Sequence, residues 1–490
     1  MSALAGVYNP LGTAPLYGDA MFFNLGTGTD ESFRAVTSAT TGVWVYNFDY
    51  TDANVNNLWQ QLYIGIERAN LLIANINLAP MDARKRKAIL GEALFMRGYY
   101  YFLLVSNFGD VPLQIVPTAS PSNISRPRTP AKEVYAQILK DMQDAEDKVY
   151  TSTELDYSSR ISKTVVEGIL ARVCLTMAGY PLQDQTQYAA ALKWASKVQS
   201  SGEHALVTNA VNPDGDNNSG FSQIFVNEMQ DKYDVREIMW EAEEKGNRAD
   251  GYTANGRVGN DIGIGYTATN YADSGYCYGT IRVTQRLYNL YGTGDLRRDW
   301  AIGPFSYTSA GARSYFASNK IYDRNAAKWR RTYETLTPKD KNYTPANFPL
   351  LRYADVLLML AEAENQVNGP TQVAYDAINA VRRRGYGKPV SVANATADIP
   401  AGLSPQQFQQ AVQDERSREL CFEALRKPDL IRWGIFIPTM KAVAAEFKAY
   451  NGTYAYGALA GNNVAEKHLL YPIPSGEISV NKAASQNPGW

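Results

Sequence analysis

The most regular pattern of apolar residues in the chain lies between Asp82 and Pro112. Apolar residues recur there at the helical spacings of three and four, at Ile89, Ala93, Met96, Tyr100 and Leu103. Large apolar and aromatic residues also occupy the other faces, which predicts a helix that is buried on several sides. Asp82 can cap its start, Gly109 suits the turn after its end, and Pro112 prevents continuation.

Further helices are predicted on both sides of this one. Residues 52–78 carry an apolar stripe and would pair with residues 82–107 as an antiparallel hairpin. The same periodicity predicts helices over residues 131–149, 160–178, 186–200, 351–368, 371–384 and 404–426. The pattern of the chain therefore indicates a mainly α fold.

Two helical hairpins resemble each other in sequence. Residues 170–181 with 188–198, and residues 360–370 with 374–384, each read as an Ala-containing helix, a turn with Gly and Pro, and a second Ala-rich helix. Small residues at helix contacts are typical of tetratricopeptide-like repeats, and we predict such a helix-pair scaffold over residues 52–200 and 351–434. Because the period is irregular, generic helix pairing stays open as the alternative.

The character of the chain changes over residues 203–350. Asn, Gly, Asp and Tyr replace Ala and Leu, and ten of the 33 tyrosines lie in residues 252–322. A short alternating run at residues 236–243 predicts one strand, so little β structure is expected. Long irregular insertions in compact proteins are usually functional, and we predict that this one carries a ligand-binding face.

Composition excludes several functions. The 490 residues are 45% hydrophobic and carry a net charge of −1 without a long basic run, which argues against nucleic-acid binding. Three cysteines without CxxC spacing suggest neither a disulfide framework nor a zinc site. No stretch approaches the 18 apolar residues of a membrane span.

Motifs for catalysis or cofactors fail in their context. Residues 263–268 nearly match a dinucleotide fingerprint, but no Val-rich strand precedes them. Residues 212–220 begin like a calcium loop, with Asp214, Asp216 and Asn218 at alternate positions, but Ser219 stands where an EF-hand requires Gly. A looser calcium site stays open. We expect no cofactor and no enzymatic activity.

The run DERSREL places clustered charges near the end of the chain. Glu415, Glu419 and Glu423 are spaced for one helix face, with arginines nearby. Such carboxylates could form an acid/base pair. We favour the other interpretation, in which they form ion pairs that join helices.

Three separated segments carry a family resemblance, together with the closing run YPIPSGEISVNKAASQNPGW: residues 92–113, 348–367 and 414–434. They closely resemble the SusD/RagB family, the nutrient-binding lipoproteins of Bacteroidetes outer membranes, in the right order over essentially the whole chain. Lys427-Pro428 departs from the family, which usually has aromatic or apolar residues before the following Asp-Leu. The resemblance implies one SusD-like domain over residues 1–490, with four tetratricopeptide-like helix pairs and a variable face.

The resemblance also implies a function. Such proteins bind glycans, or peptides in the RagB branch, at the cell surface, and they cover a SusC-like TonB-dependent transporter. They are anchored in the outer membrane by an N-terminal lipidated Cys, which this chain lacks, so the anchor is an expectation from the family alone. A helical glycoside hydrolase is the alternative from another class.

Sugar recognition needs flat apolar surfaces together with planar polar groups that bond hydroxyls. Two loop stretches supply both, and they correspond to the early loop and central insertion that bind ligand in the family. From them we predict ligand contacts at Asp30, Arg34, Trp44, Tyr46, Asn47, Asp49, Asn270, Tyr271, Asp273, Tyr276, Tyr278 and Trp300. Trp59, Trp194 and Trp433 lie at helical spacing and are predicted to pack between helices.

Overall fold

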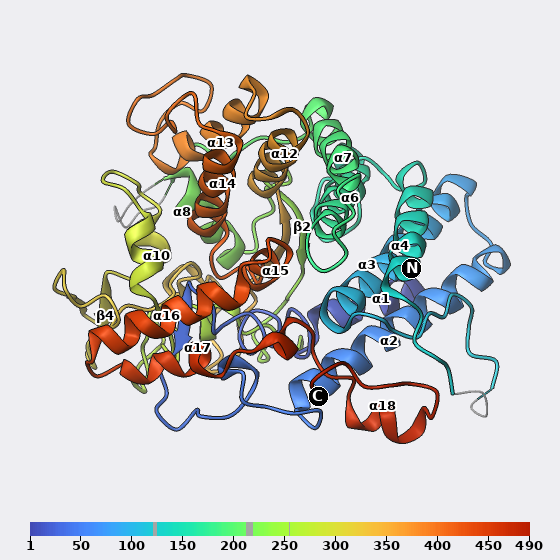
Figure 1. The fold of residues 1–490 in the computed structure, drawn as a ribbon, viewed down its shortest axis with the longest axis horizontal. Helices are drawn as coiled ribbons and strands as arrows, with labels where there is room; N and C mark the ends of the chain where they lie inside the picture. The colour runs from blue at the N-terminus through green and yellow to red at the C-terminus, as the bar shows by residue number, and fades with distance from the viewer. Residues whose placement is uncertain (121–124, 212–218, 254) are drawn as a thin grey trace.

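The computed structural model describes residues 1–120, 125–211, 219–253 and 255–490. Helices follow one another along an arc, from α1–α4 at the right of Figure 1 through α6 and α7 to α12–α14, and the short elements of residues 203–350 lie mostly on the left, beside and below α13 and α14. The helices of the arc, with the C-terminal α16, are α1 Ser2–Tyr8, α2 Ala53–Asn75, α3 Ala83–Phe108, α4 Ala131–Glu146, α6 Lys163–Ala178, α7 Gln187–Ser201, α12 Tyr353–Asn368, α13 Gln372–Gly385, α14 Pro405–Leu420 and α16 Phe436–Tyr450. The mainly α fold is confirmed.

Helix α3 is the central element of the N-terminal half. The Asp82 carboxylate accepts a hydrogen bond from the Lys85 amide at 3.0 Å, and Gly109 ends the helix with φ of 71°. Tyr99, Tyr100 and Tyr101 are all buried. By length and composition alone α3 could cross a membrane, but 94% of its most apolar window is buried within the protein. It is therefore a core helix.

Neighbouring helices pack in pairs: α2 with α3, α3 with α4, α6 with α7, and α12 with α7, α13 and α14. Close approach depends on small residues. A Cβ at Gly65 of α2 would lie 2.4 Å from the ring of Tyr100, so only glycine lets these two helices meet. Trp59 and Trp194 are buried between helices, as predicted, and Trp433 is half-buried.

Shorter helices and 3-10 turns lie between the helices of the arc, in residues 203–350 and in the C-terminal segment. The helices are α5 Ser152–Leu155, α8 Gly220–Met229, α9 Val258–Asp261, α10 Gln285–Leu290, α11 Arg298–Ala301, α15 Arg426–Arg432, α17 Leu459–Asn463 and α18 Ser475–Val480. The 3-10 turns are η1 Asn9–Gly12, η2 Val43–Val45, η3 Ile76–Leu78, η4 Arg331–Tyr333, η5 Ala455–Ala458 and η6 Glu466–Leu469.

Three antiparallel strand pairs are present among the described residues, and the first two join distant segments. They are β1 Ser32–Arg34 with β3 Ile281–Val283, β2 Ile238–Ala242 with β6 Phe348–Arg352, and β4 Phe305–Tyr307 with β5 Arg313–Tyr315. The strand predicted at residues 236–243 is confirmed as β2. The pairing of β1 with β3 places the early loop directly against the central insertion.

The helix predicted over residues 404–426 is wrong in its length. Helix α14 ends at Leu420, and a turn with positive φ at Phe422 and Ala424 separates it from α15. Glu423 therefore approaches Glu419 from this turn and not from the same helix face. The local sequence has no glycine at either position, which hid the turn from a pattern analysis.

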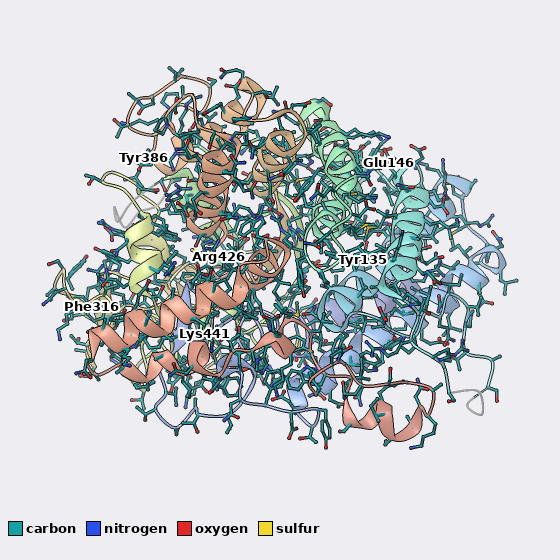
Figure 2. All side chains as sticks on the ribbon, in the orientation of Figure 1. Tyr135, Glu146, Phe316, Tyr386, Arg426 and Lys441 are labelled. Atoms are coloured by element: carbon teal, nitrogen blue, oxygen red, sulfur yellow. The ribbon has the colours of Figure 1, made fainter. Side chains whose placement is uncertain are left out.

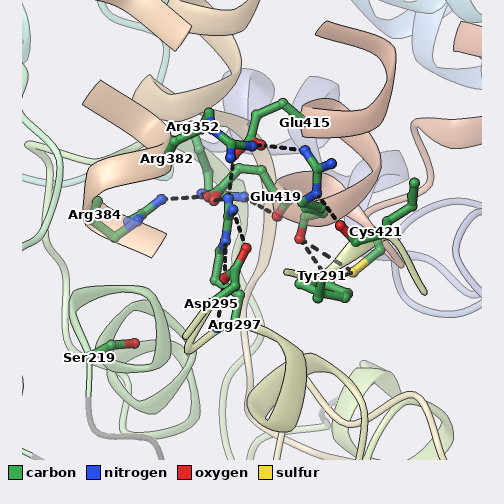
Figure 3. A network of polar contacts seen from close by, with 12 residues as sticks. Ser219, Tyr291, Asp295, Arg297, Arg352, Arg382, Arg384, Glu415, Glu419 and Cys421 are labelled. Atoms are coloured by element: carbon green, nitrogen blue, oxygen red, sulfur yellow. Dashed lines mark hydrogen bonds and ion pairs between the residues drawn. The ribbon is translucent and has the colours of Figure 1, made fainter. Parts of the chain in front are cut away.

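A buried network of charged side chains joins α14 to α13, β6 and the insertion (Figure 3). Glu419 accepts from Arg352 at 2.9 Å, from Arg297 at 3.1 Å and from Arg384. Glu415 accepts from Arg297 at 2.6 Å. These five side chains are essentially inaccessible to solvent. The ion-pair interpretation of the DERSREL carboxylates is confirmed.

Candidate functional site

The early loop places two of the predicted ligand residues against each other. The Arg34 guanidinium, at the end of β1, lies 4.2 Å from the ring of Trp44 in η2 and 4.6 Å from the ring of Phe23. A Cβ at Gly42 would lie 2.6 Å from the Trp44 indole, so this glycine makes room for the ring. Arg34 and Trp44 are both half-buried, and each keeps part of its surface open to solvent.

Next to Arg34 lies a pair of carboxylic acids. Arg257 contacts both carboxylates, at 3.5 Å for Asp19 and 3.3 Å for Asp261. Burial raises the pKa of Asp261 to about 8, and Asp19 adds to the rise while Arg257 opposes it. Asp19 and Asp261 together hold Arg257 in place.

Arg257 connects this pair to three tyrosines of the insertion. Its guanidinium lies 5.8 Å from the ring of Tyr278. The ring of Tyr276 meets Tyr278 edge-on at 5.2 Å, and Tyr271 meets Tyr276 edge-on at 5.8 Å. The Tyr278 hydroxyl donates to Asn342 at 3.0 Å. Tyr278 is exposed and Tyr271 and Tyr276 are half-buried, so part of each ring can meet a ligand.

The side chains from Trp44 through Arg34 and Arg257 to Tyr278, Tyr276 and Tyr271 form one series, which we call the aromatic surface. Lys341 adds an exposed ammonium 4.9 Å from the ring of Tyr276. Flat rings, two guanidinium groups and the Asn342 amide all belong to this surface. It can therefore cover apolar faces of a ligand and bond its hydroxyl or carbonyl oxygens.

Other predicted ligand residues are buried in packing roles. Asp30 pairs with Arg426 at 2.7 Å. The Tyr46 hydroxyl donates to the Gly28 carbonyl at 2.9 Å, and the Trp300 Nε1–H donates to the Lys328 carbonyl at 3.1 Å. All three predicted residues expose less than a tenth of their surface. They present no face to a ligand, because tertiary neighbours cover residues that the sequence placed on loops.

The remaining predicted residues are exposed but lie outside the aromatic series. Asn47 donates to the Thr40 carbonyl, and Asp49 accepts two hydrogen bonds from Thr51, which lower its pKa. Asn270 accepts from a tyrosine hydroxyl at 2.6 Å. Asp273 is exposed beside Tyr271 in the same loop, and its carbonyl accepts from a lysine.

Pattern analysis missed the polar half of the surface. Arg257 and Asp261 come from α9 and its N-cap, Lys341 and Asn342 come from a later turn of the insertion, and Asp19 comes from the N-terminal segment. Their spacing in sequence carries no periodic signal. The one available hint was local, since Arg257 lies within the tyrosine-rich residues 252–322 and Asn342 follows them, in a region already predicted to bind ligand.

Acidic clusters suited to a metal are not found among the described residues. The candidate calcium ligands Asp214, Asp216 and Asn218 lie outside the described residues. Ser219, which is described, caps α8 by accepting from the Ser222 amide. The free cysteines Cys174, Cys277 and Cys421 are buried, and burial raises the pKa of each thiol to about 12, so they are unreactive.

The fold and the aromatic surface define a class of protein: a helical scaffold in which an early loop and a long insertion build one ligand-facing side. Residues 236–490, just over half of the chain, match the family model described as the SusD family, and residues 12–175 match one described as "Starch-binding associating with outer membrane". The chain belongs to the SusD family.

Individual relatives agree over the full length. SusD-like protein P25 of Formosa agariphila is 25% identical over 98% of this chain and 89% of its own. A crystal structure of a SusD homolog from Bacteroides thetaiotaomicron is 30% identical with a TM-score of 0.90, covering 100% of this chain and 96% of that one. Surface glycan-binding protein A from the same species was solved in complex with laminarihexaose and shares the fold, with 18% sequence identity and a TM-score of 0.73. The match covers 99% of this chain and 98% of that one.

Proposed function

We propose that this protein is a cell-surface glycan-binding protein that captures oligosaccharide on the aromatic surface and passes it to a SusC-like TonB-dependent transporter. The observation that carries the proposal is the continuous series from Trp44 to Tyr271, in which two loops distant in sequence meet. Binding is non-covalent and needs no cofactor. An N-terminal lipid anchor would hold the protein at the outer membrane, where the transporter lies.

The chemistry of the surface supports a sugar ligand. The C–H faces of a pyranose pack on flat rings, and its hydroxyls accept from guanidinium and ammonium groups and donate to amide oxygens. Lys341, Arg257 and Asn342 supply such groups beside the rings of Tyr276 and Tyr278. The starch-binding description of the N-terminal family model supports the same ligand class, and membership of the SusD family supports the transporter as partner.

The carboxylates of the site argue against hydrolysis. A retaining glycosidase holds its two catalytic carboxyl groups about 5–5.5 Å apart, and an inverting enzyme holds them further apart. Asp261 is instead buried at 1% exposure, and Arg257 pairs with both Asp19 and Asp261. A carboxyl group that solvent does not reach cannot act on a glycosidic bond, so the surface suits binding without turnover.

We expect Tyr278→Ala and Tyr276→Ala each to weaken glycan binding by about 5–30-fold, because a buried aromatic contact is worth about 1–2 kcal/mol at a binding site. The double variant should bind more weakly than either. Affinity is measured by calorimetric titration with a panel of α- and β-linked oligosaccharides and a parallel panel of peptides. Product formation is followed by chromatography.

Tyr315→Ala is the matched control, because Tyr315 is 62% exposed on β5 and lies outside the aromatic surface. Its affinity should equal that of the wild type. If the protein bound only peptides, the proposed glycan function would be wrong and the RagB-type peptide-binding function would take its place. Product release from an oligosaccharide would refute the non-enzymatic function.

A further inference from the structure

A second, separate cavity lies where the helical scaffold meets the C-terminal segment. Its volume is about 520 Å³, within the range of about 300–1,000 Å³ that holds drug-sized ligands. Its walls come from α3, α4, α6, α15 and the residues after η6, and Figure 2 marks two of these places with Tyr135 on α4 and Arg426 at the start of α15. None of the residues of the aromatic surface lines it.

The walls of this cavity are mostly apolar. They include Leu25, Phe102, Leu175, Leu182, Leu425 and Leu470. Tyr180, Pro181 and Pro428 also line it and are exposed, so the cavity opens to solvent between the turn after α6 and the start of α15. An apolar cavity of this size with an open mouth suits a small molecule with an alkyl or aryl body.

One end of the cavity is polar and has unused donors. Arg172 lines it, and the guanidinium uses its terminal nitrogens to bond the Leu350 carbonyl and Asp355, at 2.9 Å and 2.6 Å. Its Nε–H is buried and has no partner among the described residues. An unbonded buried donor costs about 1–3 kcal/mol, so a ligand that accepts from it gains this energy.

A pair of tyrosine hydroxyls completes the polar end. Tyr17 and Tyr99 line the cavity and bond each other at 2.6 Å. That bond uses one of the two O–H groups, which leaves the other available as a donor. The arginines that line the cavity, Arg172, Arg416 and Arg432, are already paired with Asp355, Asp429 and Glu362. The unused donors of Arg172 and the tyrosine pair, and not a net charge, therefore set the chemistry of the ligand head, which should be a strong acceptor such as a carboxylate.

We propose that this cavity binds an amphipathic carboxylic acid, with its alkyl or aryl body between α3, α6 and α15 and its carboxylate at Arg172 and the tyrosine pair. The site is distinct from the aromatic surface. An acid bound there would leave glycan contacts untouched, and its existence does not depend on the proposed glycan function.

The test uses decanoate and decyltrimethylammonium, which share an alkyl chain and differ in the sign of the head, each below its micellar concentration. Calorimetric titration of the full chain should show one decanoate site, at least tenfold tighter than any binding of the cation. Thr176→Phe fills the cavity one helical turn from Arg172 and should weaken decanoate binding at least tenfold. Arg172→Lys keeps the positive charge but removes the Nε–H donor, and it should weaken decanoate binding about threefold to tenfold.

Thr153→Phe, at an exposed position of α5, is the matched control and should bind decanoate as the wild type does. Should Thr176→Phe unfold, as judged by its melting temperature, Leu182→Trp narrows the mouth instead and should give the same loss. Absence of decanoate binding would overturn the proposal. The proposal would also be overturned if decanoate and decyltrimethylammonium bound equally well and Thr176→Phe changed neither affinity. That result would indicate adsorption to the protein surface.

Discussion

Glu419→Gln should lower the free energy of unfolding by about 3–5 kcal/mol, the usual cost of breaking a buried ion pair by removing one partner. Burial alone would raise the pKa of Glu419, but Arg384, Arg352 and Arg297 outweigh it and lower the pKa, so the side chain is ionised in the fold. Removing that charge leaves three buried guanidinium groups with too few acceptors. The loss is measured as a shift in guanidinium-induced unfolding.

Glu446→Gln is the matched control for this prediction. Glu446 pairs with Arg286 at 2.6 Å, but both side chains are about a third exposed. Exposed pairs contribute about 0–1 kcal/mol, so this variant should unfold almost as the wild type does. Equal losses for Glu419→Gln and Glu446→Gln would contradict the role we give the buried network, which is to lock α13 and α14 onto the insertion.

Lys427→Met should stabilise the protein by about 2–4 kcal/mol at pH 7. Lys427 is 8% exposed, and its ammonium meets the Tyr471 hydroxyl at 3.2 Å and the rings of Tyr471 and Tyr46. No acidic side chain pairs with it among the described residues. Burial lowers its pKa to about 7, because no carboxylate compensates the buried amine. Burying this amine lowers the free energy of unfolding, and a buried methionine would not.

The pH dependence of this gain has a fixed sign. Between pH 7 and about 10.5 the unfolded chain binds a proton at Lys427 that the folded protein does not bind. The free energy of unfolding of the wild type therefore rises with pH across this range. The advantage of Lys427→Met should therefore be constant below pH 7 and should shrink towards pH 10. Melting temperatures of both proteins across this range provide the measurement.

Lys448→Met at an exposed position of α16 is the control, and it should leave stability within about 0.5 kcal/mol of the wild type. A destabilised Lys427→Met protein would show that the bond to Tyr471 and the aromatic contacts outweigh the burial of the amine. The sequence had already set Lys427 apart as a departure from the apolar residue that the resemblance implies there. The structure shows why this departure should lower stability, because the Lys427 amine is buried without a carboxylate partner among the described residues.

The elements with strong periodicity were determined by the sequence. The three-and-four spacing between Asp82 and Pro112 predicted α3 almost to the residue, because an apolar helix has few alternatives once caps mark both ends. The alternating run at residues 236–243 predicted β2, and helical spacing placed Trp59 in the core. The DERSREL carboxylates were correctly assigned to ion pairs.

Only the tertiary structure decided which loop residues form the aromatic surface. We predicted both Trp44 and Trp300 as ligand contacts on loops, yet the first is half-buried and the second is buried at 0% exposure. The pairing of β1 with β3 places Arg34 opposite Ile281, more than 200 residues later in the chain, and no local pattern encodes that contact. Helix periodicity is a property of neighbouring residues, whereas burial and charge pairing in loops depend on which distant segments pack against them.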